Sequence, residues 1–153
     1  MPTPTERLRE LGLELPAVAT PAGAYLPARR SGSLVFTAGQ LPMVDGVLPV
    51  TGKVGAEVDP DTAYGLARTC ALNALSAAAS VVGLDAITGV VKVVGFVASA
   101  PGFTGQPKVI NGASDLLGEV FGAAGRHARS AVGVSELPMN TPVEVELVVE
   151  VTS

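Results

Sequence analysis

The sequence predicts an α+β fold in which a mixed β-sheet carries two main helices on one face. Three stretches predict it: valine-rich 88–98, alanine-rich 60–82 with helical spacing, and strictly alternating 143–151. Strands, helix, strand, helix and strands follow one another along 153 residues, the length of one domain. We expect a single domain over 1–153, with an N-terminal helix and extension over 1–22.

The N-terminal segment is predicted to contain one short helix followed by a loop. Thr3 and Glu6 have capping-box spacing, and Pro4 suits a first helical position. Gly12 can end this helix. The stretch 16–30 is rich in proline, glycine and alanine, which favours a loop laid over the core.

The next segment is predicted to form a strand and a hairpin. Residues 34–38 read LVFTA, which favours a strand. Asp45-Gly46 is a hairpin-turn signal, so 41–44 and 47–50 are predicted to pair. A proline in each of these two stretches suits only the edge of a sheet.

The clearest helix is predicted to begin at Asp59-Pro60, because aspartate can cap a helix and proline fits its first turn. Apolar residues recur at helical spacing until Gly83, and their many alanines permit close approach to a sheet. The segment 88–98, which contains VVKVVGFVA, is predicted to be a buried strand.

The C-terminal half is predicted to alternate a loop, a helix and two strands. We expect a loop over 101–107, a helix over about 109–121, and strands over 128–136 and 143–151. In the last strand, valine and leucine share one face while three glutamates and Val148 share the other.

One face of the strand at 128–136 is predicted to be open to a second subunit. Arg129, Ala131, Gly133 and Ser135 alternate along it and are small apart from the arginine. Small side chains on an uncovered sheet face permit another copy of the chain to pack closely. We therefore expect this set of residues to face away from the helices.

The composition indicates a protein that associates with itself. Charged residues make up 16% of the chain, against roughly 25% in a typical soluble domain, and 48% is hydrophobic. A spanning helix needs about 20 apolar residues. The uncharged run 69–84 is interrupted by polar residues and 93–107 by glycine and proline, so we expect no membrane partner. MPTPTERLRELG lacks a signal-peptide core, which indicates a cytoplasmic protein.

Several function classes are disfavoured by the residues present. A net charge of −4, six Phe and Tyr residues and no tryptophan argue against nucleic-acid binding. Cys70 is the only cysteine and occupies a core position of the predicted helix, while His127, the only histidine, is predicted to be a half-exposed turn residue. Gly46 to Lys53 does not have the spacing of a phosphate-binding loop. An active site must therefore depend on arginine, carboxylates and backbone groups.

An ordered set of short pieces resembles the RidA (YjgF) family of reactive-intermediate deaminases and covers about Gly23 to Val151. In chain order these pieces are Gly23-Ala24-Tyr25, Thr37-Ala38-Gly39-Gln40-Leu41-Pro42, Asn73-Ala74-Leu75, Val91-Lys92-Val93, Asn111, Ala128-Arg129-Ser130, Leu137-Pro138 and Val143-Glu144-Val145-Glu146. The resemblance implies a chorismate-mutase-like fold and a homotrimer with sites in the clefts between subunits. It also implies cofactor-free hydrolysis of 2-imino acids, the tautomers of enamines, to 2-oxo acids and ammonia.

The resemblance assigns the two main roles to charged residues. Arg129 matches the carboxylate-binding arginine, and a guanidinium can hold a carboxylate with two parallel hydrogen bonds. Glu144 matches the water-positioning glutamate, and a carboxylate beside a water can take its proton. The ordinary alternatives are an arginine paired with Glu136 or Glu144, and a solvated strand glutamate.

The resemblance also assigns supporting roles, each with an ordinary alternative. Tyr25 matches a substrate-side tyrosine, Asn111 a site-lining asparagine, and Gly39 a glycine whose backbone approaches the substrate. Loop packing, a helix cap and a turn glycine would explain the same residues. Ala131 stands in the substrate-binding region where many members have cysteine, and Ala38 stands where the family often has serine. These departures and the longer 41–58 segment indicate a divergent subgroup.

Two other functions remain compatible with the same resemblance. The trimer can bind a 2-oxo or similar carboxylate through Arg129 without turnover, as a regulatory protein would, and the alanines at 38 and 131 favour this alternative. Ribonuclease or translation-inhibitor activity, a label given to parts of the family, is disfavoured by charge and composition.

Overall fold

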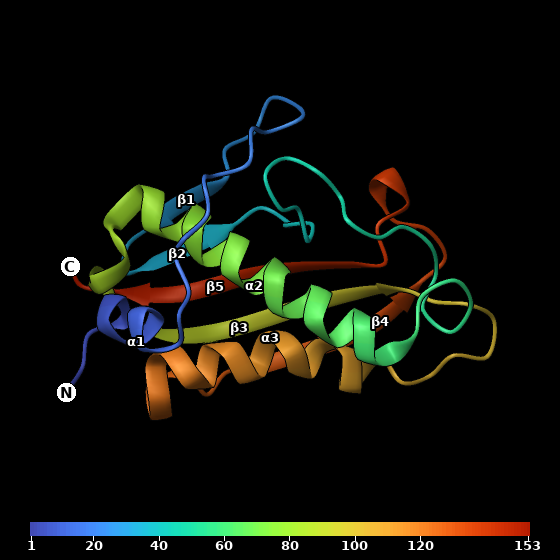
Figure 1. Cartoon of the computed structure of the whole chain (residues 1–153). Coiled ribbons are helices and arrows are strands. Elements are labelled where there is room, and N and C mark those ends of the chain that lie inside the picture. The colour runs from blue at the N-terminus through green and yellow to red at the C-terminus, as the bar shows by residue number, and fades with distance from the viewer.

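The computed structural model describes residues 1–153 and contains one five-stranded mixed sheet with two long helices on one face (Figure 1). The strands are β1 (Ala28–Ser31), β2 (Leu34–Thr37), β3 (Ile87–Ala98), β4 (Ala128–Val134) and β5 (Val143–Val151). Their spatial order is β1-β2-β5-β3-β4, and only β3 and β4 run parallel. The predicted α+β class is confirmed.

Helices α1 and α2 begin where their capping residues predict, whereas α3 does not. They are α1 (Pro4–Glu10), α2 (Pro60–Val82) and α3 (Gln106–Phe121), with short 3₁₀ turns at Leu84–Ala86, Gly122–Gly125 and Pro138–Asn140. Thr3 and Glu6 form the predicted capping box, and the Asp59 side chain accepts a hydrogen bond of 2.8 Å from the Thr62 backbone N–H. Helix α3 begins three residues earlier than predicted, because Pro107 fits its first turn.

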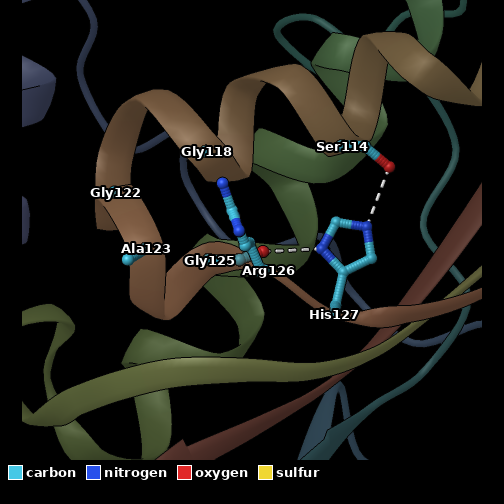
Figure 2. Close-up of a pocket in the computed structure, with 7 residues that line it drawn as sticks. All are labelled: Ser114, Gly118, Gly122, Ala123, Gly125, Arg126 and His127. Atoms are coloured by element: carbon cyan, nitrogen blue, oxygen red, sulfur yellow. Dashed lines mark hydrogen bonds between the residues drawn. The ribbon is translucent and has the colours of Figure 1, made fainter.

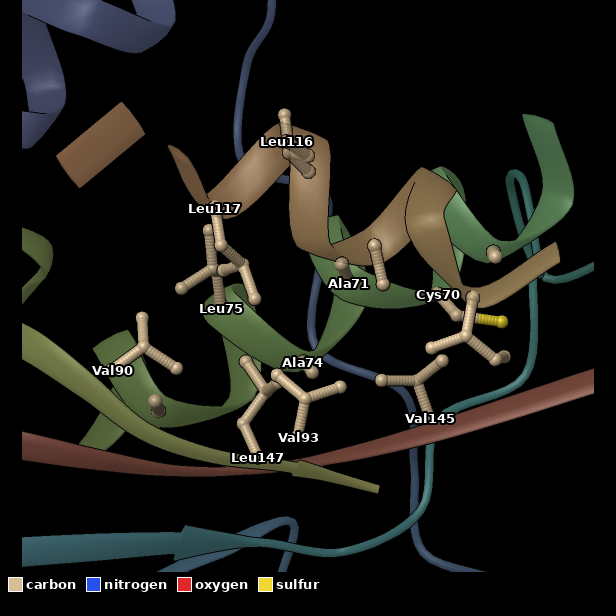
Figure 3. Packing of buried hydrophobic residues seen from close by; sticks show 14 of the residues in the cluster. Cys70, Ala71, Ala74, Leu75, Val90, Val93, Leu116, Leu117, Val145 and Leu147 are labelled. Atoms are coloured by element: carbon tan, nitrogen blue, oxygen red, sulfur yellow. The ribbon is translucent and has the colours of Figure 1, made fainter. Parts of the chain in front are cut away.

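The core lies between the sheet and the layer formed by α2 and α3. Thirty buried residues form one cluster, part of which is drawn in Figure 3. Ala71 and Ala74 are fully buried, so α2 approaches its neighbours closely. A Cβ on Gly95 would overlap Ile110, which brings α3 equally close to β3. Cys70 is fully buried in this layer, as predicted, and burial raises the pKa of its thiol well above the ordinary value.

Helix α2 is the one helix whose length and apolar composition would allow it to cross a membrane. Slightly more than half of its most apolar window is buried inside the fold. In Figure 1 it lies across the sheet beside α3. It therefore serves as the core helix of a soluble fold.

Two predictions for the N-terminal third are wrong. Residues 28–30 form β1 and pair with β2, although 16–30 was predicted to be a loop. The 41–44 and 47–50 stretches form no strands: Val44 and Val47 exchange backbone hydrogen bonds of 2.9 and 3.0 Å, and pairing ends there. The turn at Asp45 is as predicted, but the flanking prolines cannot donate to a ladder.

The predicted orientation of β4 is also wrong. Arg129 lies opposite the fully buried Val93 and its side chain contacts α3. Ala131 packs against the core, and a Cβ on Gly133 would approach the Gln106 side chain of α3. This set of residues therefore faces the helices and not the open side of the sheet.

The open face of the sheet is apolar at several positions. Phe36 is opposite Val148, and Phe96 is opposite Val132. Phe36 and Val132 remain 45% and 43% exposed. Glu144 lies on this same face, because the residues on either side of it point into the core.

Candidate functional site

Glu144 lies in a pocket of about 300 Å³, here called the Glu144 pocket. Its walls come from four segments. They are residues 11–27 before β1, here called the strap, the loop after β2, helix α2, and the turn before β5. The lining residues are Ala19, Thr20, Pro21, Ala22, Tyr25, Pro27, Gly39, Gln40, Leu41, Met43, Asn73, Pro138, Met139 and Glu144. Most of these residues are apolar or small. Glu144 is the only one of them with a charged side chain.

The Glu144 carboxylate has no hydrogen-bond or ion-pair partner within the chain. Burial raises its pKa above the ordinary value, and the neighbouring Glu146 charge raises it further. Both effects disfavour the ionised form. A half-buried carboxylate whose pKa lies closer to neutrality is well suited to accept a proton from water.

The backbone beside Glu144 is set by the loop that follows β2. Gln40 N–H donates to the Val145 carbonyl at 2.8 Å, and Val145 N–H donates back to the Gln40 carbonyl at 3.0 Å. This exchange holds Gly39 directly against Glu144, where a Cβ would overlap the carboxylate. Gly39 therefore leaves room for the acid to occupy its position.

The remaining walls of the pocket are anchored to α2. The Asn73 amide donates to the carbonyls of Leu41 and Met43 at 2.9 and 3.0 Å, which fixes the loop after β2. Ser76, one turn further along, donates to the Pro16 carbonyl and holds the strap that crosses α2 in Figure 1. Tyr25, whose side chain is half exposed, also lines the pocket.

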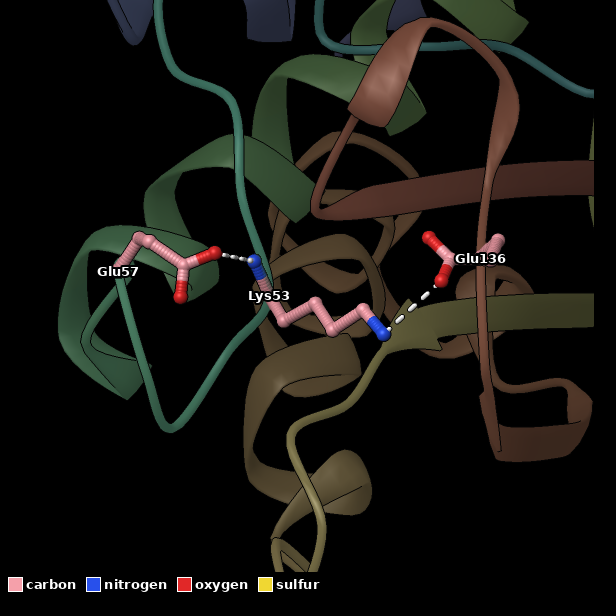
Figure 4. Close-up of polar contacts among 3 residues, drawn as sticks. All are labelled: Lys53, Glu57 and Glu136. Carbon is pink, nitrogen blue, oxygen red and sulfur yellow. Dashed lines mark hydrogen bonds and ion pairs between the residues drawn. The ribbon is translucent and has the colours of Figure 1, made fainter.

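The turn before β5 is held by contacts with Gly52 and Lys53. Gly52 N–H donates to the Asn140 carbonyl at 2.9 Å, and the Lys53 ammonium lies 3.0 Å from Glu136 (Figure 4). The Lys53 backbone N–H also donates to Glu57 at 3.3 Å. Within this turn Met139 adopts a left-handed φ of 58°, an uncommon conformation for a residue other than glycine. The turn is thus fixed where it lines the Glu144 pocket.

Arg129 belongs to a second group of polar residues, here called the Arg129 cluster. Its Nη1 donates to Asn111 Oδ1 at 2.8 Å and to Ser114 Oγ at 3.2 Å. Its Nη2 donates to the Pro107 carbonyl at 3.4 Å. All three acceptors lie on α3, so this helix sets the orientation of the guanidinium.

The contacts of Arg129 leave part of its guanidinium free. Both hydrogens of Nη1 and one hydrogen of Nη2 are used, whereas Nε–H and the other Nη2–H have no partner in the chain. Because a guanidinium carries five N–H donors in a planar fork, two donors remain. Two donors on adjacent nitrogens are what bidentate binding of a carboxylate requires.

One chain does not bring Arg129 and Glu144 together. Strand β3 separates β4 from β5, with Arg129 opposite Val93 and Glu144 opposite Phe96. Two strand spacings and three residues along the strands place the two Cα atoms roughly 14 Å apart. The side chains also point to opposite faces of the sheet. Each chain therefore carries two separate halves of the predicted site.

Comparison with known proteins identifies the family of the chain. Residues 5–151 match the family described as "YjgF/chorismate mutase-like, putative endoribonuclease". The chain belongs to the YjgF family. Protein TCP17 of Trypanosoma cruzi is 45% identical over 148 residues, which cover 95% of this chain and 92% of that protein.

Solved structures of YjgF-like proteins resemble the chain over almost its whole length. Atu1372 of Agrobacterium tumefaciens, described as of unknown function, is 46% identical with a TM-score of 0.88, covering 95% of this chain and 91% of that one. A "putative endoribonuclease" from Shewanella oneidensis is 36% identical with a TM-score of 0.94, covering 98% and 100%. E. coli TdcF, solved with bound serine, is 25% identical with a TM-score of 0.63, covering 91% and 94%.

Within this YjgF-family fold the predicted residues divide between the two groups. Tyr25 and Gly39 line the Glu144 pocket. Asn111 lies inside α3, where its side chain accepts from Arg129, so it is not a helix cap. Ala131 shares the face of Arg129 but packs against the core. Arg129 pairs with neither Glu136 nor Glu144, contrary to the ordinary alternative.

Sequence reasoning missed several residues that shape the two groups. Ser114 lies three residues after Asn111 and thus on the same helical face, a spacing that could have indicated it. Gln40 and Asn73 belong to the pieces that resemble the family, yet their anchoring contacts depend on segments remote in sequence. No group of three or more His, Cys, Asp or Glu residues is arranged to hold a metal ion.

Proposed function

We propose that the protein hydrolyses reactive 2-imino acids, or their enamine tautomers, to 2-oxo acids and ammonia without a cofactor. The observation that carries this proposal is the unpaired, half-buried Glu144 carboxylate, with its raised pKa, in a pocket that contains no other charge. Membership of the YjgF family and the free donors of Arg129 support it. The labels of the relatives name other activities or none.

Arg129 is proposed to bind the substrate carboxylate. Its Nε–H and free Nη2–H are the donors for two parallel hydrogen bonds, while α3 holds the other side of the guanidinium. A serine bound to E. coli TdcF shows that a protein with this fold takes a small amino acid carrying a carboxylate. The corresponding 2-imino acid presents the same carboxylate next to the reacting carbon.

Glu144 is proposed to act as the general base. It accepts a proton from a water molecule as the water oxygen bonds to C2, and the imine nitrogen takes up a proton to give a carbinolamine. The hydroxyl proton is then transferred to the nitrogen as the C2–N bond breaks, so the nitrogen leaves as ammonia and the 2-oxo acid forms. One imine and one water thus yield one 2-oxo acid and one ammonia.

A homotrimer is proposed to join the two halves of the site. Since one chain holds Arg129 and Glu144 on opposite faces, a cleft between subunits is needed to combine them. The exposed Phe36 and Val132 on the open face provide apolar surface that a second copy can cover. This surface also accounts for the low share of charged residues.

Ammonia release from 2-iminobutanoate or 2-iminopropanoate, generated in situ by an amino-acid oxidase, tests the proposal. The purified protein is expected to accelerate release, and Arg129→Ala to abolish the acceleration. Arg7→Ala, on the N-terminal helix, is the matched control and is expected to behave as wild type. Equal activity in wild type and Arg129→Ala would refute the role of Arg129.

A second candidate is a regulatory trimer that binds a small carboxylate without turnover. The alanines at 38 and 131, where related proteins often have serine and cysteine, favour it. Thermal stabilisation by 2-oxobutanoate that depends on Arg129, together with no imine hydrolysis, would decide for this candidate. RNA cleavage that copurifies with the protein and disappears in Glu144→Gln would instead support the endoribonuclease label of the relatives.

A further inference from the structure

His127 and Ser114 form a hydrogen-bonded pair beside Arg129. Figure 2 shows the Ser114 hydroxyl from α3 pointing at the imidazole, with Oγ and Nε2 2.8 Å apart. The other ring nitrogen, Nδ1, lies 2.7 Å from the Gly125 carbonyl oxygen. Arg129 Nη1 reaches the same Ser114 oxygen from the other side at 3.2 Å. Four groups thus form one continuous chain of hydrogen bonds.

The direction of every bond in this chain follows from the Gly125 carbonyl. A carbonyl oxygen only accepts, so Nδ1 carries the hydrogen in this contact. In the neutral imidazole Nε2 is then an acceptor, and the Ser114 hydroxyl donates to it. The Ser114 lone pairs are left to accept from Arg129. One orientation of the hydroxyl satisfies both neighbours.

We propose that Ser114 and His127 are positioning residues that fix the Arg129 guanidinium for carboxylate binding. This inference rests on the proposed function, because it assumes that Arg129 holds the substrate carboxylate. Pro107 and Asn111 hold the guanidinium at one nitrogen each, and Ser114 takes the remaining Nη1 hydrogen. That third contact prevents the planar group from turning away from the direction of its two free donors.

The proposal differs from a catalytic role for the Ser–His pair. The Ser114 oxygen already accepts a hydrogen bond from a cation and donates to a ring nitrogen, so both of its neighbours are held in place. Donation to an imidazole is also how a nucleophilic serine is held, but here the oxygen accepts from the Arg129 cation as well, which occupies a lone pair and lowers its nucleophilicity. The pair therefore acts on Arg129 rather than on the substrate.

A positioning role predicts an effect on substrate binding rather than on turnover. The carboxylate is held alike in the ground state and the transition state, so a looser guanidinium raises KM and leaves kcat nearly unchanged. Ser114→Ala removes one hydrogen bond to a charged group, which corresponds to a rise in KM of about tenfold. His127→Ala leaves the Ser114 hydroxyl in place and is expected to raise KM by a smaller factor.

Steady-state imine hydrolysis by the protein, with thermal unfolding of each variant, tests the proposal. Ser114→Thr keeps the hydroxyl and is expected to retain the KM of wild type. Arg126→Gln is the matched control, because Arg126 lines the same surface pocket as His127 but does not bond to Arg129. Equal KM in wild type and Ser114→Ala, or an equal rise in Arg126→Gln, would overturn the proposal.

A second readout keeps the two proposals distinguishable. Nitrogen-15 NMR of the Arg129 side chain reports how fast its Nη groups rotate, whether or not substrate is turned over. Slow rotation in wild type and in Ser114→Thr, with faster rotation in Ser114→Ala, is expected. If the protein hydrolyses no imine, the proposed function fails while this NMR comparison still decides the positioning role. Identical rotation in all three proteins overturns the positioning role alone.

Discussion

Replacing Gly39 by alanine tests whether the position of Glu144 is essential for catalysis. A Cβ at residue 39 would overlap Glu144 Oε2 and lie 2.9 Å from its Cδ. The φ angle of Gly39 is not left-handed, so alanine can adopt the same backbone. The entire effect of the substitution therefore falls on the glutamate side chain.

The size of the effect follows from the displacement. Ordinary carbon contacts are about 3.5–4.0 Å, so the carboxylate has to move by roughly 1–2 Å. A misplacement of about 1 Å in a reacting group can reduce the rate about 100-fold. An off-rotamer side chain costs about 0.5–1.5 kcal/mol, which lowers the Tm of a chain this size by about 1–6 °C. We expect kcat for imine hydrolysis to fall about 100-fold in a protein that remains folded.

The assay compares kcat, KM and thermal unfolding of Gly39→Ala with those of Gly65→Ala. Gly65 lies inside α2, and an added Cβ there would have no atom within 4 Å, so alanine is expected to stabilise the helix by about 0.5–1 kcal/mol. The activity of Gly65→Ala is expected to be that of wild type. A kcat for Gly39→Ala within a factor of two of wild type would refute the reasoning, because the glutamate would then tolerate displacement.

Three further predictions concern charge, packing and assembly. Because the folded pKa of Glu144 is raised, its protonated form stabilises the fold, and this stability is lost as pH rises from about 4.5 through the raised value. Glu144→Gln is therefore expected to raise the Tm at pH 8 but not at pH 4, and to abolish hydrolysis; equal shifts at both pH values would contradict this. Gly112→Ala is expected to lower stability by about 1–3 kcal/mol in denaturant titrations, because its Cβ would overlap the Tyr64 carbonyl across the α2–α3 contact. Val132→Glu, on the open face, is expected to yield monomers in sedimentation experiments, with loss of hydrolysis; an unchanged trimer would show that this face is not the interface.

The elements predicted with success are those whose evidence lies within one segment. The capping residue Asp59, the helical spacing up to Gly83 and the alternation in 143–151 each specify an element without reference to the rest of the chain. Strand β1 carries no such signal. Its sequence ARRS has low strand propensity, and it forms only because the neighbouring β2 offers a free edge.

The candidate site was predicted as a set of residues, and its geometry was not. The resemblance assigned Arg129 and Glu144 to one site without the order of their strands, and in the sheet β3 lies between them. The sheet order places β3 there, and strand order depends on pairings between segments remote in sequence. The contacts of Asn111 and Asn73 likewise depend on which segment packs beside each helix.

The incorrect face of β4 has a physical cause that also bears on the site. A strand of alternating small residues fits either face of a sheet, because a shift of one residue exchanges the two sets of side chains. Here the polar residues of α3 select the face: Asn111 and Ser114 offer acceptors that the Arg129 guanidinium needs. The same selection leaves Val132 on the open face, where it adds exposed apolar surface. One set of hydrogen bonds therefore determines both how Arg129 is held and which residues of β4 are free to form an interface.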